Sequence, residues 1–71
     1  MTLNELRWFT HRLLTQSPGA VKIRRDPASG LLVVCLYSSS CELGRGKDAI
    51  EAAIAVAKWA VENARREAAG R

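Results

Sequence analysis

Few side chains in this sequence could support chemistry at an active site. Catalysis requires a nucleophile beside a base, paired carboxylates or a set of metal ligands. The 71 residues include one histidine, His11, and two cysteines, Cys35 and Cys41, which excludes the usual four-ligand zinc patterns. His11 has polar neighbours typical of a surface position, and the serine run at residues 38–40 is typical of a turn. We therefore expect a non-enzymatic protein with no cofactor, no metal and no small-molecule substrate.

The sequence also predicts the compartment in which the protein works. Its first residues lack the basic and then apolar layout of a signal peptide, and no apolar run approaches the roughly 20 residues of a membrane span. We expect a cytoplasmic protein with no membrane partner. Cys35 and Cys41 would then stay reduced and serve as small buried hydrophobes, with a disulfide across a hairpin as the alternative.

Size and charge limit the fold and favour certain partners. The chain is short enough for one domain, assigned to residues 1–71 with residues 69–71 frayed. A domain of this size buries only about 60% of the surface of its unfolded chain, which makes a stabilising dimer attractive. The net charge of +4 and the pI of about 9.7 favour acidic partners, such as nucleic acid, a membrane surface or an acidic protein.

Capping signals and hydrophobic periodicity predict a helix and then three strands. Thr2 and Glu5 form a capping box, so a helix begins there and continues to about Thr15. The core side of this helix holds Leu3, Leu6, Phe9, Thr10, Leu13 and Leu14. The strands are expected at residues 20–25, 31–37 and 41–43, with turns at residues 26–30 and 38–40 and an end at residues 44–46.

A second helix is predicted from Lys47 or Asp48 to about Ala68. Alanine recurs there, and Asp48 and Glu51 suit the positive end of a helix. Its core side is expected to hold Ile50, Ala53, Ile54, Ala57, Val61 and Ala64. The elements together predict an α+β fold of the order α-β-β-β-α, in which a three-stranded antiparallel sheet packs against two helices.

Neither tryptophan falls on the expected core side of its helix. Trp8 lies beside Arg12 on the first helix, and Trp59 is grouped with Val56 on the second. A tryptophan buries on the order of 150–250 Å², so two idle rings would be costly for a small domain. Contact with a subunit or partner is one interpretation. Oblique packing under a loop and stacking on a base or sugar are the others.

The second strand, residues 31–37, is apolar on both of its faces. If both helices lie on one side of the sheet, the other side exposes apolar surface, which usually marks an interaction site. Lys22 and Arg24 would rim whichever face is open. Helices that straddle the sheet and cover both faces are the alternative.

A Gly-x-Gly segment precedes the second helix. Backbone N–H groups at a helix start, together with Arg45 and Lys47, could bind an anion such as phosphate. The same spacing also occurs in a plain turn from strand to helix, so both interpretations stay open.

The order of elements resembles that of the double-stranded RNA-binding domain. The matching segments are Leu3-Asn4-Glu5-Leu6, Leu43-Gly44-Arg45-Gly46 and the alanines Ala49, Ala52, Ala53 and Ala57. The resemblance implies binding to double-stranded or structured RNA through Arg24, Arg25, Arg45 and Lys47. The family grips phosphates with lysines in the first turn of its last helix, where this chain has Asp48-Ala49-Ile50. Fewer phosphate contacts imply weaker RNA binding.

Our leading hypothesis is a small interaction protein that docks a protein partner or its own copy through an apolar surface with a basic rim. The residues expected to contact the partner are Trp8, Arg12, Lys22, Arg24, Val56 and Trp59. In size and charge the chain is similar to accessory proteins of phages and mobile elements, including inhibitors of host defence such as anti-CRISPR proteins. RNA binding is the alternative hypothesis.

Overall fold

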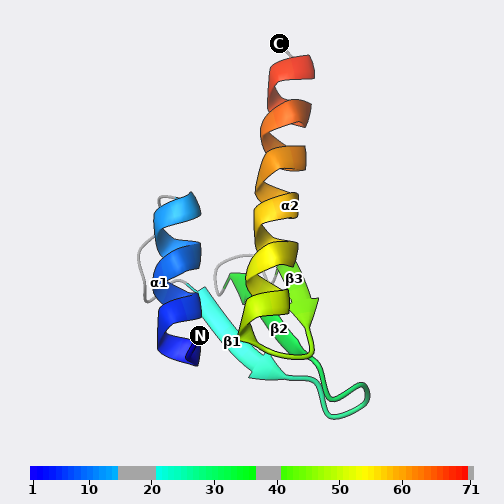
Figure 1. Cartoon of the computed structure of the whole chain (residues 1–71). Coiled ribbons are helices and arrows are strands. Elements are labelled where there is room, and N and C mark those ends of the chain that lie inside the picture. The colour runs from blue at the N-terminus through cyan, green and yellow to red at the C-terminus, as the bar shows by residue number, and fades with distance from the viewer. Residues whose placement is uncertain (15–20, 37–40, 71) are drawn as a thin grey trace.

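The computed structural model describes residues 1–14, 21–36 and 41–70, and it contains the expected five elements in the expected order (Figure 1). They are α1 (Leu3–Leu14), β1 (Val21–Arg25), β2 (Leu32–Leu36), β3 (Glu42–Gly46) and α2 (Ala49–Ala69). The strands form an antiparallel sheet in the order β1-β2-β3, and both helices pack on one face of it. The predicted fold class is confirmed. Tyr37 and the predicted turn at residues 38–40 lie outside the described residues.

Local signals in the sequence account for the start of α1. The Thr2 N–H donates to Glu5 Oε1 over 3.0 Å, and the Glu5 N–H donates to Thr2 Oγ1 over 3.1 Å, so the capping box is confirmed. Leu6 and Thr10 are fully buried. Thr10 is tolerated there because its hydroxyl donates to the Leu6 carbonyl oxygen over 2.9 Å.

The turn between β1 and β2 follows the predicted chemistry. Asp26 Oδ1 accepts from the Ala28 N–H over 3.0 Å, and Asp26 Oδ2 accepts from the Ser29 hydroxyl over 3.1 Å. Gly30 has a φ of 75°, a backbone conformation that glycine adopts without strain. This turn fixes the register that pairs Arg25 with Leu32.

The glycines at 44 and 46 lie inside β3, where α2 passes directly over them. A Cβ added to Gly44 would lie 2.8 Å from the Val56 backbone nitrogen. A Cβ added to Gly46 would lie 2.5 Å from the Ala52 backbone nitrogen. Only glycine allows the helix backbone to approach the strand this closely. The Gly-x-Gly segment therefore serves helix–sheet packing, and β3 is longer than expected.

The close approach of α2 to β3 determines which side of α2 faces the sheet. Small residues fit there, and the buried positions of α2 are Ala49, Ala52, Ala53 and Val56. Of the expected core side of this helix, Ala53 is buried and Ala57 is half-buried, and the prediction is wrong for the other four residues. Its large members, Ile50, Ile54 and Val61, are 55%, 53% and 53% exposed.

We predict that Gly46→Ala destabilises the fold, because the new methyl group would overlap the α2 backbone. The expected loss is about 1–3 kcal/mol in the free energy of unfolding, as for other overpacked sites. Urea denaturation followed by circular dichroism measures it.

Gly70→Ala is the matched control for this prediction. Gly70 has a φ of −79° at the end of α2, and an added Cβ would meet the Arg66 carbonyl oxygen at 3.3 Å. We expect its stability to stay within about 0.5 kcal/mol of the parent chain. Equal losses in the two variants would contradict the packing role of Gly46.

Candidate functional site

The exposed apolar side of α2 is a candidate interaction surface on the described residues. Ile50, Ile54, Ala57 and Val61 follow one another at spacings of four, three and four residues, which places them on one face of a helix. We call these four residues the α2 stripe. Its three large members are each more than half exposed, and Ala57 is half-buried.

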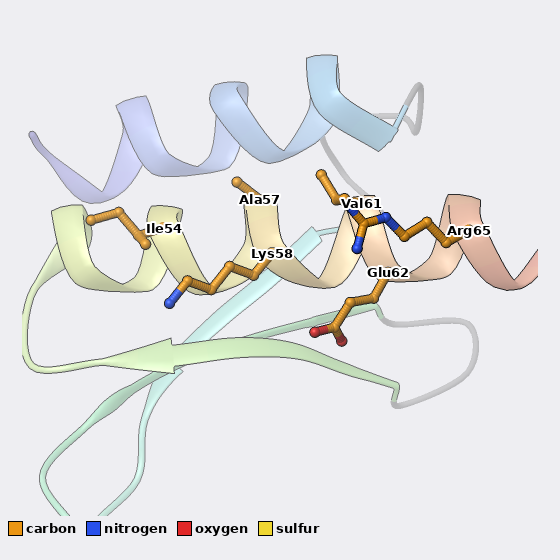
Figure 2. A pocket seen from close by; sticks show the side chains of 6 residues that line it. All are labelled: Ile54, Ala57, Lys58, Val61, Glu62 and Arg65. Atoms are coloured by element: carbon orange, nitrogen blue, oxygen red, sulfur yellow. The ribbon is translucent and has the colours of Figure 1, made fainter.

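Charged side chains border the α2 stripe and shape a shallow groove along it. The groove has a volume of about 420 Å³ and is lined by Ile54, Ala57, Lys58, Val61, Glu62 and Arg65. Figure 2 shows Ala57 and Val61 at the edge of α2 toward α1, and Lys58 and Glu62 at the edge toward β3. An apolar floor with a charged rim is the usual anatomy of a protein-binding patch.

The structure separates the two tryptophans that the sequence placed off the core. Trp8 is 46% exposed on the outer side of α1, where its ring centroid lies 5.4 Å from that of His11. Arg12 is exposed and borders the same shallow pocket as Trp8. These two predicted contact residues therefore remain on the surface together.

Val56 requires a correction, whereas Trp59 keeps part of its surface exposed. Trp59 is partly buried and packs against the core cluster, and Val56 is completely buried within that cluster. Both lie on the side of α2 that the glycines of β3 draw onto the sheet. Val56 therefore offers no surface to a partner, and Trp59 both packs against the core and borders a surface pocket.

The opposite face of the sheet carries none of the described helices, yet Val33 and Cys35 on that face are buried. The strand register places Arg24 and Arg45 on either side of Val33, and Lys22 and Glu42 on either side of Cys35. Val33 and Cys35 are only 1% and 8% exposed. Long polar side chains on neighbouring strands can cover such residues with their aliphatic stems. The expected apolar patch on this face is therefore wrong at Val33 and Cys35.

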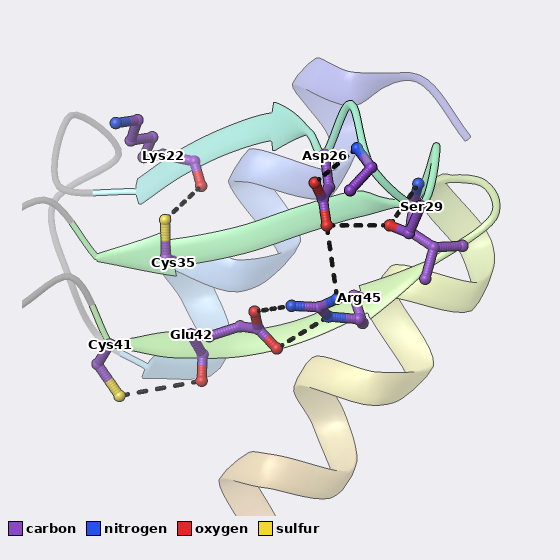
Figure 3. Close-up of polar contacts among 9 residues, drawn as sticks. Lys22, Asp26, Ser29, Cys35, Cys41, Glu42 and Arg45 are labelled. Atoms are coloured by element: carbon purple, nitrogen blue, oxygen red, sulfur yellow. Dashed lines mark hydrogen bonds and ion pairs between the residues drawn. The ribbon is translucent and has the colours of Figure 1, made fainter.

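An ion network engages Arg45, which lies on this face in the edge strand β3. Arg45 Nε donates to Glu42 Oε2 over 3.1 Å, and Arg45 Nη1 lies 3.8 Å from Asp26 Oδ2 (Figure 3). The hydrogen bond from Arg45 holds the pKa of Glu42 below its ordinary value, and the nearby charge of Arg24 adds to this effect. Hydrogen bonds from Ala28 and Ser29 lower the pKa of Asp26 in the same direction.

The four basic residues implied by the RNA-binding resemblance do not form a vacant cationic site. Arg24 and Arg45 lie on the same face but share it with Glu42 and Asp26. Arg25 Nη1 donates to the Gly30 carbonyl oxygen over 2.6 Å, and Lys47 is exposed at the turn before α2.

The first turn of α2 is capped by the side chain of Asp48. Asp48 Oδ1 accepts from the Glu51 N–H over 2.9 Å, which caps the helix. Because the Asp48 carboxylate already lies at these N–H groups, the start of α2 is a poor site for a phosphate.

Both cysteines are present as thiols in the structure. The Cys35 thiol is buried and lies 3.7 Å from the Lys22 carbonyl oxygen, and Cys41 is half-buried (Figure 3). Across the described ranges, no cluster of three or more His, Cys, Asp or Glu residues could hold a metal ion. None of the described helices is long and apolar enough to cross a membrane.

Comparison with known proteins adds no assignment. No protein-family model, no curated protein and no solved structure matches this chain. The resemblance to the double-stranded RNA-binding domain therefore stays a prediction beyond the order of elements, and function must be argued from the surface itself.

Hydrophobic periodicity placed the α2 stripe in the core, so the stripe was not predicted as a surface. A signal was present in the sequence. Two glycines at alternate positions of a strand, Gly44 and Gly46, point to the same side of the sheet and favour a helix side made of small residues. Ala52 and Ala55 lie against these glycines, so the isoleucines face elsewhere.

We predict that stability falls at acidic pH, because Asp26 and Glu42 have lowered pKa values in the folded state. A lowered pKa contributes stability above the unfolded value, about 4, and this contribution is lost as the pH falls through the folded value. In Glu42→Gln, part of the pH dependence should be absent. Urea denaturation between pH 2.5 and 6 tests this, with Glu62→Gln on α2 as the control. Parallel pH profiles for the parent chain and Glu42→Gln would show that the Arg45 pair contributes nothing.

Proposed function

We propose that this chain is a non-catalytic interaction module that docks a macromolecular partner through the α2 stripe. One observation carries the proposal. Three large aliphatic side chains stand more than half exposed on a single face of α2, while the alanines at 49, 52 and 53 of the same helix are buried. A contiguous exposed apolar patch rimmed by charges is typical of an interaction site.

The three large side chains of the α2 stripe supply only part of the free energy that a stable contact needs. Complete burial of a valine or isoleucine side chain is worth about 1.5–3 kcal/mol, so covering the exposed half of each contributes on the order of 1 kcal/mol. Association itself costs several kcal/mol, which requires a partner that covers the whole stripe. A helix or a strand edge of another protein has the shape for this.

The charges around the α2 stripe favour a partner with acidic groups. Lys58 and Arg65 line the groove and outnumber Glu62 there. Rim charges of this kind guide encounter and orientation more than they add affinity. From size and charge we propose a biological setting as well. The chain would act in the cytoplasm as an accessory or inhibitor protein of a phage or mobile element.

RNA binding is the weaker proposal. The order of elements favours it, but Arg45 is engaged by two carboxylates and Asp48 occupies the start of α2. A surface built for phosphate would leave such groups open to the ligand.

We predict that Ile54→Lys abolishes partner binding without unfolding the protein. Ile54 is exposed and lysine is a good helix former, so the fold should be retained while a charge enters the centre of the stripe. Proteins recovered with the tagged chain from cells would be identified by quantitative mass spectrometry, then purified and titrated. We expect at least a tenfold loss of affinity, as for other central interface residues.

Asn4→Lys is the control for this experiment, because it adds the same charge at an exposed position of α1. It should recover and bind the same partner as the parent chain. A partner that binds the parent chain and Ile54→Lys equally would contradict docking through the α2 stripe.

The RNA alternative is tested by electrophoretic shift of a double-stranded RNA at two salt concentrations. We expect no tight binding, and no change in function for Arg45→Glu/Lys47→Glu. Tight, salt-sensitive binding that disappears in this double variant would establish RNA as the partner in place of a protein.

A further inference from the structure

We propose that the occupant of the α2 stripe is a second copy of this chain, whose own α2 lies antiparallel across it. This inference rests on the proposed docking role of the stripe and names the partner. It follows from the order of side-chain sizes along the stripe and from the charges beside it.

The spacing of the α2 stripe is that of a helix-pairing seam. Ile50, Ile54, Ala57 and Val61 repeat at intervals of four, three and four residues, and exposed Ala64 and Ala68 continue the pattern. This is the a/d spacing along which two α-helices interlock. In Figure 2, none of the described helices or strands lies in front of the labelled side chains of α2, and α1 lies beside the edge that carries Ala57 and Val61.

Side-chain size favours the antiparallel orientation. With a two-fold axis midway between Ile54 and Ala57, Ile54 lies opposite Ala57 of the second copy and Ile50 lies opposite its Val61. Each large side chain at the centre then faces a small one, which fills the seam evenly. A parallel pair would place Ile54 against Ile54 and Ala57 against Ala57, with crowding at one level and a gap at the next.

Charge complementarity points to the same arrangement. One edge of the stripe carries three exposed charged residues at intervals of seven, Glu51, Lys58 and Arg65. The other edge carries Ala53 and Ala60, which are buried and half-buried, and then the exposed Glu67 near the end of α2. In an antiparallel pair like edges meet, so Glu51 of each copy lies between Lys58 and Arg65 of the other. In a parallel pair the charged edge would face the alanines.

A second copy accounts for these features better than an unrelated protein does. The pattern is complementary to itself, which a two-fold interface requires and a foreign partner does not. A chain of 71 residues also gains stability by burying surface that one small core cannot enclose.

The first test is sedimentation equilibrium of the purified chain over a wide range of concentrations. We expect the mass to rise with concentration from 7.8 kDa toward twice that value. Ile54→Lys should stay monomeric throughout, and Asn4→Lys should associate like the parent chain. Circular dichroism of each variant confirms that it is folded.

The second test uses two variants that should pair only with each other. Glu51→Arg makes the charged edge wholly positive, and Lys58→Glu/Arg65→Glu makes it wholly negative. Each variant alone should be monomeric at concentrations where the parent chain is dimeric. An equimolar mixture should recover the dimer mass, because the positive edge of one variant then meets the negative edge of the other.

Each outcome decides something different. A parent chain that is monomeric at every concentration overturns the second copy as occupant. The proposed docking function survives that result if a foreign partner still depends on Ile54. A dimer that persists in Ile54→Lys, or a variant mixture that stays monomeric, overturns antiparallel pairing through α2.

Discussion

The close approach of the α2 backbone to β3 is the constraint on which the rest of this structure depends. Gly44 and Gly46 present no Cβ to the helix, and the backbone nitrogens of Val56 and Ala52 occupy the space that their side chains would need. A helix held this near to a strand can present only small residues or well-placed branched ones at the contact. Ala52 and Ala55, which lie against Gly46 and Gly44, meet that condition.

The rotation of α2 about its axis then determines which residues reach the surface. Turning the alanine side inward carries Ile50, Ile54 and Val61 outward. Large aliphatic side chains are thus exposed because small ones are required at the strand. The interaction surface is a consequence of how the core is packed, and Trp59 packs against the edge of that core.

Most of the fold could be predicted from local sequence signals. The capping box at Thr2 and Glu5 and the turn from Asp26 to Gly30 depend on hydrogen bonds between near neighbours, so they are visible in the sequence itself. The rotation of α2 could not be predicted from periodicity, because the helix has two apolar sides. Periodicity ranks the isoleucine side first, whereas the glycines on β3 make the alanine side the better fit.

The opposite face of the sheet shows a second limit of sequence reasoning. A strand with apolar residues on both faces suggested an open apolar patch, but Val33 is buried although none of the described helices covers it. Whether neighbouring arginines and lysines cover such a residue depends on strand register, which a run of apolar residues does not specify. The candidate interaction surface is therefore on α2, although the sequence had indicated the sheet.

The most direct test of this account is the solvent exposure of individual methyl groups, measured by NMR with a soluble paramagnetic probe at a concentration where the chain is monomeric. The account predicts strong relaxation enhancement at the Ile54 methyl groups and almost none at those of Val56, together with close contacts between the Gly44 α-protons and Ala55. Protection of Ile54 with exposure of Val56 would mean that α2 is rotated the other way, and the proposed surface would not exist.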